Sequence, residues 1–493
     1  MIRRTSWLLA AFLLASTLQA REEYTRTFDK TIPWQRGQRV QIDHSLGDVV
    51  LRGASASEMV IHAVIRVSAS SGEEGRRFSD QIEIQTESTG PAIFVRTKYP
   101  EQHTFSGWRN VSYTVSYQIS APQMAPVQIR NSFGNVEVSG IKAGSGITNS
   151  HGKLVLRSSA GIHRLEDSFG AVQVTDNSGD VTIENSNGPV EVSGIHGAVS
   201  LRDRFGSVTV SSASGGVKIV NGNGAVRLTD AGGPSSVTNS FGAVDASGIR
   251  GDLFVNNNNG QIDARGITGS AELNTTFGAI GFADIGKQVT VRAGNAAVTG
   301  RKAGGGVTLQ TSFGRVDLAE IRGGARIVAN NGDVVLAGIV GETRVKTSFG
   351  LVDASQIGGP LVVENNNGGV KARDVENGAN IRTSFGPVLL ERIAGPLDVA
   401  NQNGAIDASL TFQQACRPVR LQTSFGPVRL RLPENANYRL TASTSFGKIN
   451  TEFPITVNGA VSSDSLSGTV GHGGCELQII DSNGSIDILK SKP

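Results

Sequence analysis

The sequence predicts an all-β protein built as a single-stranded β-solenoid, or β-helix, with rungs of about 18 residues. Phenylalanine recurs every 36 residues from Phe133 to Phe385, and glycine follows it each time. Asparagine recurs at the same interval halfway between, from Asn187 to Asn403. Two columns of aliphatic residues recur every 18 residues, and no segment of the repeat shows the 3.6-residue period of an amphipathic helix.

Each 18-residue unit is predicted to hold two short strands separated by two corners. In the unit of residues 241–258, Val244 and Ala246 form one inward pair, and Leu253 and Val255 form a second. Glycine marks both corners, because it adopts positive φ without a steric clash. Neither strand can bury its aliphatic face alone, so we expect about fifteen rungs to stack ~4.8 Å apart in a right-handed coil.

The position where phenylalanine and asparagine alternate leaves two questions open. Rungs of 36 residues with four strands would also fit the alternation, but both halves share one inward pattern, which favours 18 residues. The phenylalanines are interpreted as plugs of the core or corner, with an exposed aromatic binding row as the alternative. The asparagines are interpreted as corner supports, with a metal or glycan track as the alternative.

The N-terminus reads as an export signal. Residues 1–20 combine Arg3 and Arg4 with a short apolar stretch and with Ala20, a small residue suited to cleavage; an uncleaved anchor is the alternative. No later segment is apolar enough for a transmembrane helix. The mature chain is therefore expected to have no transmembrane segment and to reside in the periplasm or at the cell surface.

Three regions are expected after the signal. Residues 21–130 form an N-terminal β-rich cap, residues 131–410 the regular solenoid, and residues 411–493 irregular C-terminal rungs with a cap. Within the first cap, His44–Val49 resembles a first rung, and residues 73–80 are expected to form one or two helical turns. Residues 462–474 read as a loop rich in glycine and serine. The cap strands are expected at Met59–Val67, Ile82–Thr86, Ile93–Lys98 and Val111–Ile119.

Charge and cysteine content narrow the function classes. The chain holds 46 Lys and Arg against 43 Asp and Glu, so no basic excess predicts nucleic-acid binding. The only cysteines, Cys416 and Cys475, fall in different C-terminal rungs. They either pair in an oxidising compartment or remain buried or free thiols.

The repeat units resemble a known family. Recurring Ser-Phe-Gly-x-Val and Asn-x-Asn-Gly-x-Val units, and the ending Gly471–Leu489, are similar to the bacterial DUF4097 family, whose members carry the label adhesin. The resemblance covers most of the chain after the signal. It implies an envelope-associated β-solenoid with no assigned catalytic residues.

No motif in the sequence predicts catalysis, a cofactor or a metal. The seven histidines lack metal-ligand spacing, and no nucleophile elbow, Walker A or dinucleotide fingerprint occurs. Arg250-Gly251-Asp252 is interpreted as a chance occurrence in a corner, with integrin recognition as the alternative. Outward acids are interpreted as a solvated face, with a paired-carboxylate or Ca²⁺ site as the alternative. They are Asp245, Asp263, Asp317, Asp353 and Asp407.

These observations favour a non-enzymatic envelope protein, an adhesin-like scaffold that binds or spaces an envelope or extracellular protein or glycan. The alternatives are a β-helix enzyme acting on polysaccharides and an accessory protein of envelope-stress signalling. The cap is rich in aromatic residues, so a ligand contact is predicted there. The predicted contact residues are Tyr99, Trp108, Tyr113 and Tyr117.

Overall fold

The computed structural model describes residues 21–100, 111–411, 416–457 and 462–491. The predicted signal and Trp108 lie outside the described residues. The chain divides into two compact units, residues 1–161 and 162–493. The fold is an all-β solenoid with 2% helix, as predicted, and it has about 17 turns where about fifteen rungs were expected. In the described part of the chain, no helix has the length and apolar character needed to cross a membrane.

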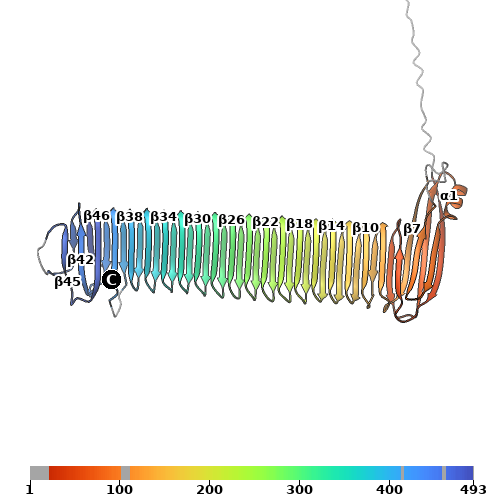
Figure 1. The fold of residues 1–493 in the computed structure, drawn as a ribbon, viewed down its shortest axis with the longest axis horizontal. Coiled ribbons are helices and arrows are strands. Elements are labelled where there is room, and N and C mark those ends of the chain that lie inside the picture. Colours follow the sequence, from red (N-terminus) through yellow and green to blue (C-terminus); the bar gives the residue numbers. More distant parts are fainter. Residues whose placement is uncertain (1–20, 101–110, 412–415, 458–461, 492–493) are drawn as a thin grey trace, which may run out of the picture. The chain divides into compact units, whose positions relative to one another are not determined.

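The first unit is the predicted N-terminal cap followed by the first rungs. Its long strands β1, β4 and β7 pair antiparallel, and β5 and β6 form a hairpin (Figure 1). The strands are β1 (Glu22–Pro33), β2 (Arg39–Asp43), β3 (Val49–Ala54), β4 (Glu58–Ala69), β5 (Glu83–Thr89), β6 (Ala92–Lys98), β7 (Ser112–Pro122), β8 (Val127–Phe133), β9 (Val136–Ser139), β10 (Ser145–His151) and β11 (Leu154–Ala160). The four cap strands predicted from the sequence are all present.

The first rung is the one that the sequence predicts around His44–Val49. Strands β2 and β3 pair in parallel with β8 and β9, and Leu46 bridges Phe133 at the position of the phenylalanine column. The helix is α1 (Gly72–Ser79), which begins at the N-cap Ser71, whose side chain accepts a hydrogen bond from the amide of Glu74. Acidic residues in its first turn and basic residues in its last oppose the helix dipole.

The second unit stacks two parallel sheets, one of odd-numbered and one of even-numbered strands (Figure 1). Equivalent strands pair with a shift of 18 residues, as in Ile262 with Ile280 and Val255 with Leu273. The rung is therefore 18 residues, and the 36-residue alternative is wrong. The aliphatic columns of both sheets are almost fully buried between them, so the inward pairs predicted from the sequence form the core.

The strand bounds follow the repeat. The even-numbered strands are β12 (His163–Phe169), β14 (Val181–Asn187), β16 (Val199–Phe205), β18 (Val217–Asn223), β20 (Ser235–Phe241), β22 (Leu253–Asn259), β24 (Ala271–Phe277), β26 (Val289–Asn295), β28 (Val307–Phe313), β30 (Ala325–Asn331), β32 (Thr343–Phe349), β34 (Leu361–Asn367), β36 (Ala379–Phe385), β38 (Leu397–Asn403) and β40 (Val419–Phe425). The odd-numbered strands are β13 (Val172–Ser178), β15 (Val190–His196), β17 (Val208–Ala213), β19 (Val226–Ala231), β21 (Val244–Ile249), β23 (Ile262–Ile267), β25 (Ile280–Ile285), β27 (Val298–Ala303), β29 (Val316–Ile321), β31 (Val334–Ile339), β33 (Val352–Ile357), β35 (Val370–Val375), β37 (Val388–Ile393), β39 (Ile406–Leu410) and β41 (Val428–Leu432).

The two corners of a rung differ. The corner after most even strands holds glycine, with Ala296 after β26 as an exception. Gly260 has a φ of 143°, and a Cβ there would lie 2.1 Å from the carbonyl oxygen of Gly242 in the preceding rung. Glycine also occupies the predicted corner after most odd strands, as Gly251 and Gly269 do. Near the end of most odd strands lies a further residue of positive φ that the sequence did not predict, and it is often not glycine. Nine such residues have φ between 54° and 58°: Asp176, Ser212, Asp230, Asp284, Lys302, Glu320, Gln356, Asp374 and Arg392.

The C-terminal strands do not stack in chain order. They are β42 (Tyr438–Thr444), β43 (Ile449–Thr451), β44 (Ile455–Val457), β45 (Ser465–Val470), β46 (Cys475–Asn483) and β47 (Ile486–Lys490). Strand β46 pairs in parallel with both β40 and β42, so the final rung of the sequence lies between two earlier ones. Strand β45 pairs antiparallel with the other edge of β42, so the prediction of a loop at 462–474 is wrong for residues 465–470.

A disulfide ties this rearranged end together. Cys416 and Cys475 are bonded, with their Cα atoms 5.7 Å apart. This resolves the alternatives that the sequence left open. The bond joins the segment that enters β40 to the first residue of β46, which is the strand paired with β40.

A buried polar column, not identified from the sequence, runs along the even-numbered strands two residues before the phenylalanine/asparagine position. It contains Asn, Asp, Thr and Ala side chains. Its asparagines donate hydrogen bonds to glycine carbonyls at the corners, as Asn257 does to Gly242 at 2.9 Å and Asn185 to Gly188 at 2.9 Å. These corner carbonyls are buried, so the column supplies partners that the strands cannot.

Asp203 occupies this column and makes stability depend on pH. Burial is the largest cause that raises its pKa from 3.8 to about 6; hydrogen bonds from the Arg204 and Phe205 amides and from Asn185 partly offset it. The folded chain therefore holds the proton more tightly than the unfolded chain. The contribution of Asp203 to stability is fully present below pH ~4 and is lost as the pH rises through about 6.

Asp203→Asn is expected to remove this pH dependence and to stabilise the protein at pH 7 by up to ~3 kcal/mol, since each pKa unit corresponds to about 1.4 kcal/mol. Urea unfolding at a series of pH values measures it. Asp245→Asn is the matched control, because its half-exposed carboxylate lies on the other sheet. Equal stability of wild type and Asp203→Asn at pH 7 would contradict the assignment.

Candidate functional site

The cap brings together the three described aromatic residues that the sequence predicts as a ligand contact. The rings of Tyr99 and Tyr113 have centroids 5.4 Å apart. The hydroxyl of Tyr117 lies 2.6 Å from Thr97 Oγ1, which lies 3.0 Å from His44 Nδ1. Burial raises the pKa of Tyr117 to about 12 and lowers the pKa of His44 to about 4, so both are neutral at pH 7.

This geometry is chiefly that of a packed cluster. Tyr117 is only 1% exposed and contacts the edge of the His44 ring in a T-shaped arrangement, so it serves packing. Tyr99 and Tyr113 are half-buried and could still meet a ligand at the surface. The contact predicted here therefore stays a prediction.

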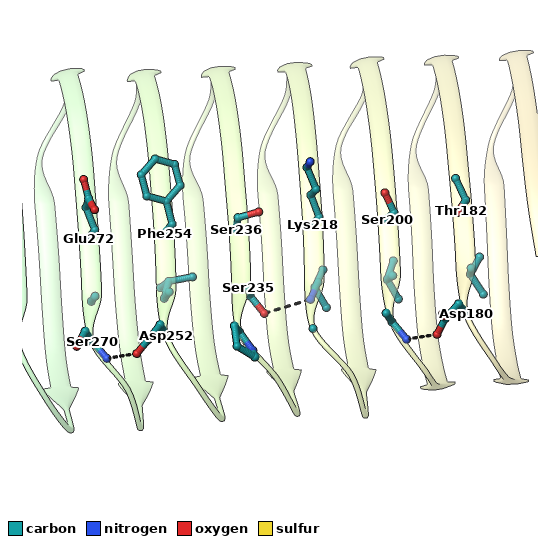
Figure 2. Close-up of a pocket in the computed structure, with 18 of the residues that line it drawn as sticks. Asp180, Thr182, Ser200, Lys218, Ser235, Ser236, Asp252, Phe254, Ser270 and Glu272 are labelled. Atoms are coloured by element: carbon teal, nitrogen blue, oxygen red, sulfur yellow. Dashed lines mark hydrogen bonds between the residues drawn. The ribbon is translucent and has the colours of Figure 1, made fainter.

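The second unit has a groove on the outer face of the even-numbered strands, which we call the even-strand groove. It spans β14 to β26 with a volume of about 710 Å³. Figure 2 shows Thr182, Ser200, Lys218, Ser236, Phe254 and Glu272 in one row, each on the next strand of the sheet. The row therefore combines three hydroxyl side chains with one cationic, one aromatic and one acidic side chain.

The charged groups of the groove are largely engaged in structure. Asp180 and Asp252 each accept a hydrogen bond at 2.8 Å from a backbone amide of the next rung, that of Ala198 and that of Ser270 (Figure 2). Glu272 pairs with Arg292. Among the described residues, Lys218 takes part in no ion pair, and the residues that line the groove include no His or Cys. The groove thus offers hydroxyls and one cation for binding, with Lys218 between its register partners Ser200 and Ser236.

The same sheet carries a second feature at the other end of its strands, which we call the Phe/Asn row. It is the column in which Phe169, Asn187 and Phe205 are consecutive register partners. The phenylalanine side chains from Phe169 to Phe425 are 50–57% exposed. The interpretation of these residues as plugs of the core is therefore wrong, and the exposure expected for the alternative, an aromatic binding row, is present. Binding by this row stays a prediction.

The asparagines of this row support the corner, as predicted. Their side-chain amides donate to serine carbonyls of the neighbouring rung, at 3.3 Å from Asn187 to Ser168 and at 3.4 Å from Asn259 to Ser240. Asn331, Asn403 and Asn483 make the equivalent bond. A backbone carbonyl at the strand end thus gains a partner, which a phenylalanine at that position cannot give.

The outward acids and the Arg-Gly-Asp sequence have structural partners. Each of the five acids lies within ion-pair distance of an arginine: Asp245 with Arg227, Asp263 with Arg265, Asp317 with Arg315, Asp353 with Arg373 and Asp407 with Arg429. Such exposed pairs contribute little to stability, and they fit a solvated face. In the Arg-Gly-Asp sequence, Asp252 is the residue that bonds the Ser270 amide, which supports the structural interpretation. Within the described ranges, no three His, Cys, Asp or Glu side chains gather as metal ligands would.

Comparison with known proteins places the chain in a family. The family model Toastrack DUF4097 matches residues 37–489. A solved structure from Clostridium sporogenes, called a "putative cell adhesion protein", is 11% identical; the match covers 57% of this chain and 98% of that one, with a TM-score of 0.15. A "putative adhesin" from Bacteroides fragilis is 12% identical, with 62% and 96% covered and the same TM-score of 0.15.

TM-scores of 0.15 carry no argument about function. No curated protein matches the sequence. The family match is of a different kind, because it extends from the first rung of the cap to the last strand. It agrees with the resemblance carried by the Ser-Phe-Gly-x-Val and Asn-x-Asn-Gly-x-Val units. The chain belongs to the Toastrack DUF4097 family.

Proposed function

We propose that this protein is a non-enzymatic, exported protein of the cell envelope whose solenoid is a scaffold that binds or spaces an envelope or extracellular partner. The carrying observation is the 18-residue register of the even-strand sheet from β12 to β38, which repeats the same surface positions rung after rung. A repeated surface suits a partner that is itself extended. The groove and the Phe/Asn row both lie on this sheet.

Two further observations support export. Residues 1–20 have the pattern of a secretory signal. The Cys416–Cys475 disulfide is of a kind that persists in oxidising compartments and is rare in the cytosol. Both favour a periplasmic or surface location.

Location is tested by fractionating the producing cells and digesting intact cells with a protease. We expect the chain in the periplasmic or surface fraction, without residues 1–20 and with the disulfide formed. Protease sensitivity in intact cells distinguishes the surface from the periplasm. A reduced chain confined to the cytosol would overturn the proposal.

The proposal that the protein binds polysaccharide without cleaving it is tested separately. Purified protein is incubated with isolated envelope polysaccharides, and retained protein and new reducing or unsaturated ends are measured. We expect retention without cleavage. New ends that appear in proportion to added protein would instead favour the polysaccharide-acting enzyme.

A further inference from the structure

We propose that the Phe/Asn row binds an extended, uncharged β-1,4-linked polysaccharide, with alternate sugars seated on successive phenylalanine rings. This inference rests on the proposed function, and it names the class of partner and the surface used. Four observations carry it: the exposure of the rings, their spacing, the lack of charge beside them, and the persistence of the alternation where the chain order breaks.

The rings form a long, regular series. From Phe169 through Phe425 to Asn483, phenylalanine and asparagine alternate as register partners in adjacent strands. Each phenylalanine is therefore two strand spacings, about 9.6 Å, from the next. Half of each side chain is exposed, and so much repeated apolar surface on one edge is typical of a binding site.

The alternation does not merely follow the chain. In sequence, the spacing changes after Phe385 and the last rung is inserted between two earlier ones. In space, Phe425 pairs with Asn483, and the Phe446 amide bonds the Ser482 carbonyl, which places Phe446 beside Asn483. Phenylalanine and asparagine thus still alternate in the rearranged rungs, so the two-rung spacing is a property of the surface and not only of a duplicated sequence unit.

The surroundings of the row match an uncharged partner. From Phe241 to Asn295, the residue before each Phe or Asn is Ser, Asn, Thr or Gly, and the two residues after it are Gly, Ala or Gln; beyond this stretch, the first charged residue at these positions is Arg315, two residues after Phe313. No charged side chain interrupts this stretch, whereas the adjoining face carries Glu272 and Arg292. An anionic polymer or nucleic acid would find no complementary charge here.

The spacing selects the linkage. In an extended β-1,4-linked glycan, successive sugars are flipped, so the same ring face recurs once per disaccharide, a length close to two rungs. The C–H-rich face of a sugar packs on the electron-rich face of an aromatic ring. Between rings, the asparagine amides that donate one hydrogen bond to the corner, as those of Asn259 and Asn331 do, have an oxygen and a second N–H for sugar hydroxyls.

The test compares two triple variants in retention on cellulose and chitin, with starch as the α-linked, coiled control. Phe241, Phe277 and Phe313 are replaced by Tyr in one variant, which keeps the rings, and by Leu in the other, which keeps the apolar character. We expect wild type and the Tyr variant to bind the β-1,4-linked glycans in low and high salt. The Leu variant should bind at least about tenfold more weakly, a loss of ~1.4 kcal/mol.

Each other result counts against the proposal. Equal binding by the Tyr and Leu variants, or equal binding to starch, overturns the aromatic and linkage assignments. Wild type that binds no glycan but sediments as a dimer, with a monomeric Leu variant, shows that a second copy covers the row. In either case an exported, envelope-retained chain leaves the proposed function standing, whereas a cytosolic chain removes both. Circular dichroism and the thermal midpoint confirm that the variants are folded.

Discussion

Val237→Asp is expected to destabilise the solenoid by at least ~4 kcal/mol. The substitution places a carboxylate and a small cavity in an aliphatic core that offers the charge no partner. Val237 is 0% exposed, and its register partners Ile219 and Val255 are equally buried. A carboxylate there would face the aliphatic column of the opposite sheet. The rungs around β20 should open first, which hydrogen exchange of β18, β20 and β22 amides would show.

Thr238→Asp is the matched control. Thr238 follows Val237 in β20, and its side chain points outward. It lies between its register partners Val220 and Asn256 in the neighbouring rungs. We expect a change within about 0.5 kcal/mol, as for most surface substitutions. Urea midpoints that fall equally for the two variants would show that the alternation of inward and outward residues is misassigned.

Replacing both cysteines by serine is expected to weaken the C-terminal rungs by up to ~4 kcal/mol, since the disulfide closes a loop of 59 residues. The chain-entropy model gives this magnitude for a loop of that length. The effect should be local, because each rung contacts chiefly its neighbours. Faster hydrogen exchange in β42, β46 and β47, with unchanged exchange near β22, is the expected signature.

Reduction provides the control for the cysteine variant. Dithiothreitol should accelerate proteolysis of the C-terminal rungs in wild type and leave the double variant, Cys416→Ser with Cys475→Ser, unchanged. If reduction leaves the proteolysis of wild type unchanged, the bond contributes nothing to the stability of this end.

The regular part of the fold follows from the sequence because the pattern is redundant. The columns of Val244 and Val255 are aliphatic in every regular rung, and those of Ala246 and Leu253 in most, so one misread residue cannot change the rung length. The cap strands and α1 were also predictable, since alternation and a serine N-cap act locally. Handedness is a property of connections in space and stays a prediction.

The exposure of the phenylalanines could not be predicted from alternation. In β24, Ala271, Leu273 and Thr275 point inward, and strict alternation would place Phe277 with them. The strand ends there, and the corner at Gly278 turns the backbone, which directs the ring outward. The buried Asn257 was missed for the opposite reason, because a polar residue at an inward position reads as part of an Asn-rich surface.

The stacking order of the C-terminal strands could not be predicted from the sequence either. The spacing of the repeat indicates which segments form rungs, but it does not indicate which rungs are neighbours. Strands β46 and β47 lie between two earlier rungs: β46 pairs with β40 and β42, and β47 pairs with β41 and β43. Until β46 and β47 have been synthesised, the facing edges of β40/β41 and β42/β43 therefore lack their strand partners. Growth of the stack in this region cannot proceed by simple addition of the next rung, because a later segment must insert between two earlier ones.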